Sequence, residues 1–266
     1  MLTVRAPTRL KITPTHAVRY VLGLLVAAVV GVVQAGEVSV AVAANFTAPM
    51  AQIAADFEKA TGHKAVLSYG ATGRFYAQIS NGAPFDVLVA ADAATPAKLV
   101  KESKAVSASN FTYATGRLAL WSAVPGFVDA QGDVLRRGQF RYVAIAAPLL
   151  APYGAAAMQT LDQLGLRAAI QPKLVTGESV GQAFTMVATG NAELGFVALS
   201  QVFENGKLKT GSVWVVPASA HSPITQDAAL LNRGQSNPAA VALLAYLKTD
   251  KAKAVITSFG YGVPNR

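Results

Sequence analysis

LSYGATGRFYAQI, residues 67–79, is the stretch that decides the fold. Its first residues form a β-like run, and its last residues have the spacing of a helix. Between them lies the turn GATG, in which Gly70 and Gly73 flank Ala71 and Thr72. A strand that turns directly into a helix is the repeating unit of α/β proteins. The turn carries no catalytic side chain, so its two glycines and its hydroxyl need another explanation.

The same strand, turn and helix pattern repeats along the rest of the chain. Short runs rich in valine, alanine and isoleucine alternate with amphipathic stretches, which indicates an α/β protein with βαβ units around mostly parallel sheets flanked by helices. The expected strands are 37–44, 65–69, 86–90, 142–146, 173–176, 194–199 and 212–217. The expected helices are 47–62, 73–80, 96–103, 155–165, 181–191 and 238–259.

A continuous apolar segment at 111–123 is long enough to leave one sheet and enter another. A second crossover is expected in the polar passage after Pro217, and the two crossovers predict two lobes joined by a hinge. The hinge residues are expected near Gly116 and Arg117 and after Pro217. The predicted boundaries are 36–116 for the first part of lobe 1, 117–221 for lobe 2, and 222–266 for the segment that returns to lobe 1.

The first 35 residues have the pattern of a secretory signal peptide. Basic residues precede an apolar run at about 20–33, which ends in a small-residue cleavage signature, and we expect cleavage after Ala35. The run is short for a transmembrane helix, which needs roughly 20 apolar residues. An uncleaved membrane anchor remains the alternative. Export predicts a periplasmic protein.

The charge of the chain argues against a nucleic-acid partner. The net charge is +9, but four of the 23 basic residues and none of the 14 acidic residues lie in the leader, which leaves +5 for the rest. The remaining lysines and arginines are scattered, whereas nucleic-acid proteins cluster theirs. A modest positive charge steers small anions toward a protein. Cysteine is absent, which excludes thiol chemistry and cysteine-ligated metal.

The histidines and aspartates do not form an obvious metal or catalytic site. His63 and His221 stand in polar, loop-like segments and are expected at the surface, and the third histidine, His16, lies in the leader. Asp86 and Asp92 are expected to have structural roles at a strand start and a helix cap. We therefore expect neither a bound zinc ion nor enzymatic activity.

Four turns in the chain share one property, which is that small or hydroxyl residues precede a helix. These turns lie at 44–47, 70–73, 151–154 and 178–181. The first N–H groups of a helix lack partners within the helix, and the helix dipole is positive there. Each turn is therefore a potential anion-binding site. The alternative for each is a plain helix cap or tight turn.

Three longer stretches resemble a known family, the periplasmic molybdate-binding proteins of ABC transporters. They are VAVAANFTAPMAQIAADFEKATG (40–62), SYGATGRFYAQISNGAPFDVLVAAD (68–92) and GNAELGFVALSQV (190–202). The resemblance runs from about Val38 to the C-terminus. It implies a two-lobed, type II periplasmic-binding-protein fold with the ligand cleft between the lobes. It also implies a monomer that binds molybdate or tungstate as the oxyanion, without a cofactor, and docks on a membrane permease.

The resemblance also implies which residues contact the ligand. They are Asn45, Thr72, Tyr153 and Val180, with Ala44 and Gly73 as neighbours. Some family members add a tyrosine hydroxyl where this chain has Ala198, so Tyr153 is expected to contribute either its hydroxyl or its amide. Many members have serine at positions 45 and 72, and Asn45 and Thr72 preserve a donor at both.

The proposed contacts fit the chemistry of molybdate. A fully deprotonated dianion only accepts hydrogen bonds, so its site should present donors. None of the proposed contacts is acidic, and Arg74 is expected to contribute little. The alternatives are a binding protein for another tetrahedral oxyanion such as sulfate, an exported enzyme, and the ligand-sensing half of a transcription regulator.

Overall fold

The computed structural model describes residue 3 and residues 35–264, so the predicted signal peptide lies almost entirely outside the described residues. The strands are β1 Glu37–Ala43, β2 Lys64–Gly70, β3 Val87–Val89, β4 Phe111–Gly116, β5 Leu118–Ser122, β6 Val143–Ala146, β7 Leu174–Gly177, β8 Leu194–Ala198, β9 Phe203–Glu204, β10 Lys207–Leu208, β11 Ser212–Val215 and β12 Ile224–Leu230. The α-helices are α2 Thr47–Thr61, α3 Thr72–Ser80, α4 Ala94–Lys101, α5 Val134–Arg137, α6 Pro152–Gln163, α7 Arg167–Ile170, α8 Val180–Ala188, α9 Leu199–Val202, α10 Pro238–Leu247 and α11 Asp250–Ser258. Short 3₁₀ turns are η1 Ala44–Phe46, η2 Gln171–Lys173, η3 Ala218–Ala220 and η4 Asn232–Ser236. None of the helices in this described part combines the length and the apolar character that crossing a membrane requires.

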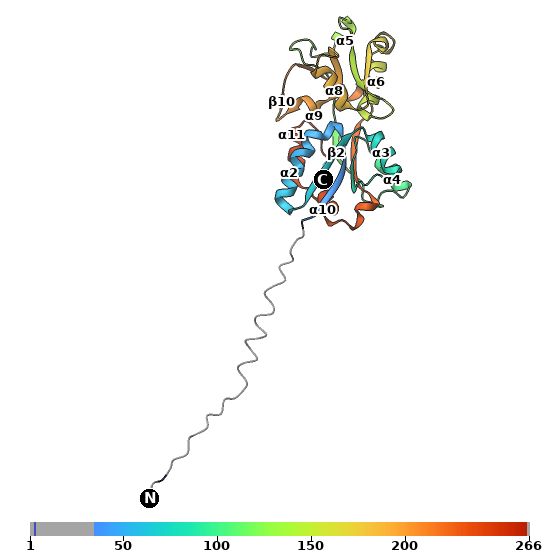
Figure 1. Cartoon of the computed structure of the whole chain (residues 1–266). Coiled ribbons are helices and arrows are strands. Elements are labelled where there is room, and N and C mark those ends of the chain that lie inside the picture. The colour runs from blue at the N-terminus through green and yellow to red at the C-terminus, as the bar shows by residue number, and fades with distance from the viewer. Residues whose placement is uncertain (1–2, 4–34, 265–266) are drawn as a thin grey trace. The chain divides into compact units, whose positions relative to one another are not determined.

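The described residues form two five-stranded sheets, each covered by helices, and one small two-stranded sheet (Figure 1). The first sheet has the order β2-β1-β3-β12-β4, and the second has the order β11-β5-β8-β6-β7. In the first sheet, β1 runs parallel to β2 and β3, while β12 runs antiparallel to β3 and β4. The two-lobed α/β fold is confirmed, and both sheets are mixed, because the strands that connect the lobes run against the βαβ units.

The chain passes between the two sheets where the apolar segment predicted it. β4 belongs to the first sheet and β5 to the second, with Arg117 as the one residue between them. The chain returns after β11 and enters the middle of the first sheet as β12. The strands of the first sheet therefore come from 37–116 and 224–230, and those of the second from 118–215.

Local sequence explains where the helices begin and end. α2 ends before Gly62, whose φ of 74° is left-handed, a conformation that glycine adopts without steric cost. α3 begins at Thr72, one residue earlier than predicted, within the GATG turn. The predicted helix at 238–259 is two helices, because the chain breaks at Lys248 and Thr249 caps α11 by accepting a hydrogen bond from the Ala252 N–H.

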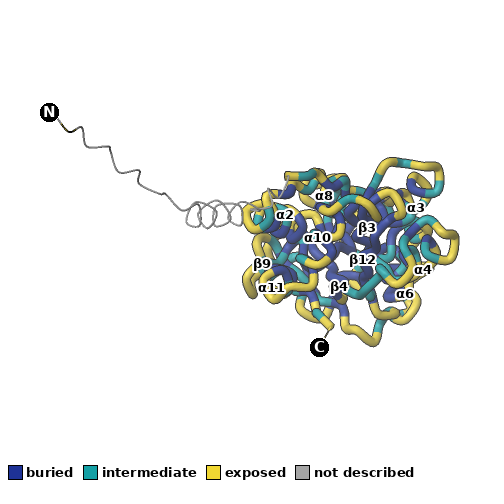
Figure 2. The backbone as a smooth tube through the Cα atoms, turned by 90° about the horizontal axis from the view of Figure 1, so that it is seen from below, coloured by how far each residue is buried: buried dark blue, intermediate teal, exposed yellow. Residues whose placement is uncertain are grey.

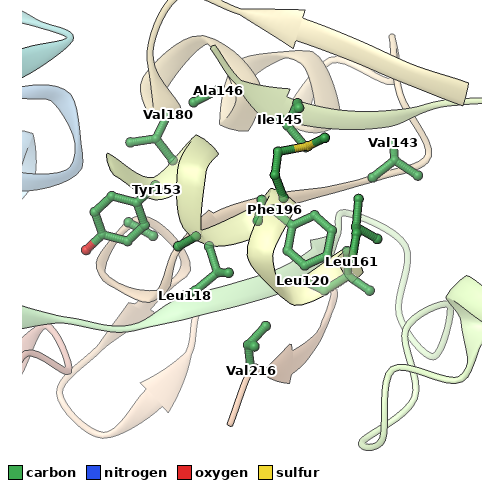
Figure 3. Close-up of a cluster of buried hydrophobic side chains, with 14 of the residues drawn as sticks. Leu118, Leu120, Val143, Ile145, Ala146, Tyr153, Leu161, Val180, Phe196 and Val216 are labelled. Carbon is green, nitrogen blue, oxygen red and sulfur yellow. The ribbon is translucent and has the colours of Figure 1, made fainter. Parts of the chain in front are cut away.

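Each sheet has its own apolar core. Figure 2 shows the central strands β3 and β12 as buried and the outer faces of the helices as exposed. In the second lobe, Leu118, Leu120, Ile145 and Phe196 are nearly inaccessible to solvent. Side chains of this size stabilise the fold by about 1.5–3 kcal/mol each when fully buried. Tyr153 lies at the edge of this cluster, with its hydroxyl directed away from the other labelled side chains (Figure 3).

Two predictions were wrong for identifiable reasons. His63 is buried at 7% exposure, because its Nδ1 accepts a hydrogen bond from the Gly36 N–H and its ring packs near Phe57. β12 was not predicted: its first three residues, 224–226, were read as the end of a polar passage after Pro217, and Gln226 and Asp227 interrupt its apolar pattern. A bulge in the pairing between those two residues further obscures the alternation expected of a strand.

Candidate ligand-binding site

The ends of β1 and β2 and the starts of α3, α6 and α8 surround one small cavity of about 10 Å³. Of the predicted ligand contacts, Asn45, Thr72, Tyr153 and Val180 line it, and each is at most 3% exposed. The complete lining consists of Ala43, Ala44, Asn45, Gly70, Ala71, Thr72, Ala91, Ala151, Pro152, Tyr153, Ser179 and Val180. Gly73 is the one predicted site residue outside this set.

The three helix starts make the cavity favourable for an anion. α3 begins at Thr72, α6 at Pro152 and α8 at Val180, all residues of the lining. The first N–H groups of each helix have no partners in the helix, and each dipole places about half a positive charge at this end. Ser179 caps α8, because its hydroxyl oxygen accepts a hydrogen bond of 3.3 Å from the backbone N–H of Gln182. The lining contains no acidic side chain, so negative charge here meets no carboxylate.

Thr72 has a hydroxyl group that is fixed on one side and free on the other. Its Oγ1 accepts a hydrogen bond of 2.9 Å from the backbone N–H of Ala91. A hydroxyl that accepts one bond still has its own hydrogen to donate. Thr72 is 1% exposed and lines the cavity, so this hydrogen is available to an acceptor bound there.

The Asn45 side chain is held by residues behind the cavity. Its Nδ2 donates to Gln226 Oε1 at 2.8 Å and to Tyr261 Oη at 2.9 Å. Its Oδ1 is buried and has no hydrogen-bond partner. The amide donors expected to face a ligand are therefore engaged inside the protein in this arrangement.

Tyr153 uses its hydroxyl within the protein. The Oη accepts a hydrogen bond of 3.0 Å from Nε2 of Gln226. Burial raises the pKa of the Tyr153 hydroxyl well above its usual value, so the group keeps its proton. Tyr153 was expected to contact the ligand through either its hydroxyl or its amide. In the structure the hydroxyl points toward Gln226.

The glycines of two turns lie where the lobes touch. The Gly73 N–H donates to the carbonyl of Leu150 in the other lobe at 2.9 Å, and a Cβ on Gly73 would lie 3.0 Å from Leu150 Cα. On the opposite side, a Cβ on Gly181 would lie 3.2 Å from Cβ of Ala44. Both distances are tighter than ordinary packing. The second glycine of GATG therefore allows close approach of the lobes, and its N–H is used between them.

Gln226 is a site residue that the sequence did not indicate. It lies on β12, is inaccessible to solvent, and bonds to both Asn45 of the first lobe and Tyr153 of the second. Recognition of 224–230 as a strand would have pointed to it, because a lone glutamine inside a buried strand requires polar partners.

The charged residues lie at the rim of the cleft. Arg74 and Glu178, from different lobes, form an ion pair at 3.6 Å, and both side chains are about half exposed. They line a wider, solvent-open hollow beside the cavity and are absent from the cavity lining. Arg74 is thus a rim residue, with a partner of opposite charge.

The described residues offer no cluster of three or more histidine, cysteine, aspartate or glutamate side chains that could hold a metal ion. The two aspartates that invite attention bond to backbone groups. Asp86 accepts from the Ser39 N–H, and Asp92 accepts from the Thr95 N–H at the start of a helix.

Comparisons with known proteins agree on one family. The family profile described as bacterial extracellular solute-binding protein matches residues 38–262. The molybdate-binding protein ModA of Azotobacter vinelandii is 60% identical over 230 residues, which cover 86% of this chain and 91% of that protein. The ModA of Rhodobacter capsulatus is 51% identical over 227 residues, which cover 85% of this chain and 88% of that protein.

Solved structures show the same architecture. The periplasmic molybdate-binding protein of Azotobacter vinelandii matches with a TM-score of 0.83 and 43% identity, over 86% of this chain and all of that one. The sulfate-binding protein SubI of Mycobacterium tuberculosis matches with a TM-score of 0.68 and 16% identity, over 86% of this chain and 88% of that one. At that identity the second match concerns the fold alone.

Proposed function

The chain belongs to the bacterial extracellular solute-binding proteins, in the branch of the molybdate-binding proteins, and from that premise we propose that it captures molybdate for an ABC transporter. In this proposal the protein works in the periplasm after cleavage behind Ala35 and delivers the ion to a membrane permease. Tungstate, which has the same charge and shape, is a second ligand.

One observation carries the proposal, which is the convergence of three helix N-termini and a free hydroxyl hydrogen on a buried cavity without an acidic side chain. Molybdate is a dianion that only accepts hydrogen bonds, and such a cavity supplies donors without an opposing cation. A phosphate site, by contrast, must also accept a bond from a protonated oxygen.

We assign the ligand contacts by the atoms that remain available. Thr72 contributes its hydroxyl, because its oxygen is already fixed by Ala91. Tyr153 and Val180 contribute backbone N–H groups, because they stand in the first turns of α6 and α8. Asn45 contributes a contact from η1, the turn that follows β1, and Ala44 lies beside it.

We also propose that the predicted lobes, 36–116 with 222–266 and 117–221, rotate against each other to admit and release the ion. The hinge lies at Arg117 and in the chain between β11 and β12, where the two sheets are connected. The catch and release of an unmodified ion needs no catalytic step, so the protein acts as a carrier.

Calorimetric titration of the exported, processed protein with molybdate, tungstate, sulfate and phosphate tests the proposal. We expect strong binding of molybdate and tungstate and no measurable heat from sulfate. Discrimination against sulfate follows from cavity size, because donors left unpaired around a smaller ion cost about 1–3 kcal/mol each. Binding of sulfate but not molybdate would overturn the proposed function.

A further inference from the structure

Two close contacts between the lobes lie beside the cavity, and each involves a glycine. Gly73 of lobe 1 lies against Leu150 of lobe 2, and Gly181 of lobe 2 lies against Ala44 of lobe 1. A Cβ on Gly73 would lie 3.0 Å from Leu150 Cα and 3.1 Å from the Leu150 carbonyl oxygen, and a Cβ on Gly181 would lie 3.2 Å from Ala44 Cβ. These two lobe contacts therefore leave no room for a further methyl group.

Backbone conformation does not explain the two glycines. Neither Gly73 nor Gly181 has a positive φ, so an L-residue could adopt either backbone conformation. Both stand in the first turn of an α-helix, where alanine is the more favourable residue. The close approach of the other lobe is the feature that requires glycine at both positions.

The first lobe contact joins backbone to backbone. The Gly73 N–H donates to the Leu150 carbonyl at 2.9 Å, the usual length of such a bond, so a closer approach would compress it. The turn that carries Leu150 is itself held by backbone bonds. The Leu150 and Ala151 N–H groups donate to the Ala147 carbonyl at 3.0 and 2.9 Å, and the Ala147 N–H donates to the Gly177 carbonyl at 2.7 Å. This turn has no side-chain rotamer through which it could yield.

The second lobe contact places the Ala44 methyl group against the start of α8. The carbonyl of Ala44 accepts a hydrogen bond of 2.9 Å from Thr47 Oγ1, and the carbonyl of Asn45 accepts one of 2.8 Å from Ser200 Oγ. These bonds fix the backbone that carries the methyl group. Gly181 belongs to a helix and cannot move without its neighbours. Both sides of this contact are therefore held in place.

The lobe contacts are adjacent in sequence to the proposed ligand contacts. Gly73 directly follows Thr72, Gly181 directly follows Val180, and Ala44 itself lines the cavity. Successive Cα atoms are separated by a fixed distance of about 3.8 Å. The depth to which the lobes close and the spacing of the donors across the cavity are therefore linked.

We propose that the two lobe contacts are the stops that end closure and thereby set the size of the oxyanion cavity. The inference rests on the proposed function, because it concerns closure around the ion bound there. The stops keep the lobes from approaching far enough to bring every donor onto an ion smaller than molybdate. Sulfate is refused because donors stay unpaired around it. Gly73, Gly181 and Ala44 thus determine specificity through the position of the lobes.

A transfer of one methyl group tests the second lobe contact. Gly181→Ala adds a methyl group to the contact, Ala44→Gly removes one, and the double variant moves the methyl group from one lobe to the other. Molybdate affinity is measured by calorimetry. Sulfate affinity is measured by competition against molybdate, which also detects weak binding.

The three variants should change affinity in different directions. Gly181→Ala should hold the lobes apart and weaken molybdate binding by about 10-fold, while the melting temperature without ligand does not fall, because alanine favours the helix. Ala44→Gly should let the lobes approach further, so that sulfate competes about 10-fold more strongly and molybdate affinity stays within a few-fold. The double variant should lie within about threefold of the wild type for both ions, because residues in contact do not act additively.

Gly73→Ala tests the first lobe contact independently. The variant keeps the N–H that bonds to Leu150 and adds only the methyl group, and it should weaken molybdate binding by about 10-fold. Gly262→Ala is the control, because a Cβ there would meet no atom closer than 3.5 Å, and both affinities should stay unchanged. Thermal unfolding without ligand shows that each variant is folded, and the two contacts are tested by separate variants.

The outcomes separate this inference from the proposed function. Unchanged molybdate affinity in both Gly73→Ala and Gly181→Ala would overturn the inference, as would a double variant in which the effects of Gly181→Ala and Ala44→Gly simply add. A crystal structure of Gly181→Ala with molybdate should show the lobes further apart than in the wild-type complex, and identical lobe positions would also overturn it. A wild-type protein that fails to bind molybdate would instead overturn the proposed function.

Discussion

The two lobes meet in two chemically different regions. Deep in the cleft the contacts are neutral, such as Gln226 with Tyr153 and the Ser200 hydroxyl with the Asn45 carbonyl at 2.8 Å, and these residues are nearly inaccessible to solvent. At the rim the contact is the ion pair of Arg74 with Glu178, which is about half exposed. The buried contacts between the lobes therefore carry no formal charge, and the ion pair lies where solvent reaches it.

This difference indicates that the rim and the deep cleft affect ion binding in different ways. An exposed ion pair contributes about 0–1 kcal/mol, because water and salt screen it. An unsatisfied donor or acceptor in a buried site costs about 1–3 kcal/mol. We therefore expect neutral donors deep in the cleft to decide which ion is held, and charges at the rim to act on its approach. Four substitutions test this division, from the largest expected effect to the smallest.

The strongest test is to crowd the deep region with Gly116→Ala. The added methyl group would collide with the Tyr153 hydroxyl and with Gln226 Nε2, so both side chains must shift. Overpacking of this kind costs about 1–3 kcal/mol of stability. We expect lower thermal stability and a loss of molybdate affinity of about 100-fold, measured by thermal unfolding and by calorimetry.

Gly262→Ala is the matched control for this substitution. Gly262 pairs with Thr115, the neighbour of Gly116, but a Cβ there meets its nearest atom at an ordinary 3.5 Å. This variant should bind like the wild type. If Gly116→Ala also binds normally, the deep region does not govern affinity.

The second test removes one deep donor with Thr72→Val. The change deletes the hydroxyl hydrogen proposed to reach the ion and leaves the buried Ala91 N–H without its acceptor. We expect molybdate binding to weaken by about 1–3 kcal/mol in a calorimetric titration. Thr72→Ser keeps the hydroxyl and should stay within a few-fold of the wild type. An unchanged titration curve for Thr72→Val would remove Thr72 from the site.

The third test weakens a helix cap at the cavity with Ser179→Ala. Loss of an N-cap costs about 0.5–2 kcal/mol, and α8 would lose order where it faces the ligand. We expect a lower melting temperature together with a several-fold loss of molybdate affinity. Thr249→Ala removes the equivalent cap of α11, outside the cavity lining, and should lower the melting temperature alone. Equal affinity losses in both variants would show that cap position does not matter.

The same division into local and distant contacts explains what the sequence could predict. The βα junctions, the stop at Gly62 and the crossover through Arg117 depend on neighbouring residues, and the fold confirms them. The turns that line the cavity could be identified from the sequence for the same reason. Helix starts and small residues are properties of a short stretch of chain.

Contacts between distant segments could not be predicted in this way. Gln226 and Asn45 are 181 positions apart, and their bond depends on the register of β12 beside β3. The burial of His63 likewise depends on where Gly36 and Phe57 lie in the folded chain. A residue's type shows what bonds it can form, and the packing of strands and helices decides which partner it meets.

The smallest expected effect is that of Arg74→Gln at the rim. Because Arg74 is half exposed, lies outside the cavity lining and is paired with Glu178, its charge acts mainly on ions that are still in solution. We expect affinity at physiological salt to stay within a few-fold of the wild type, and the association rate to fall measurably only at low ionic strength, where screening is weak. Glu178→Gln should have the opposite effect on the rate, since it leaves the arginine unopposed. Stopped-flow binding at two salt concentrations measures both variants. A thousand-fold loss of affinity in Arg74→Gln would mean that a cation holds the ion, and the neutral donors could then no longer account for its recognition.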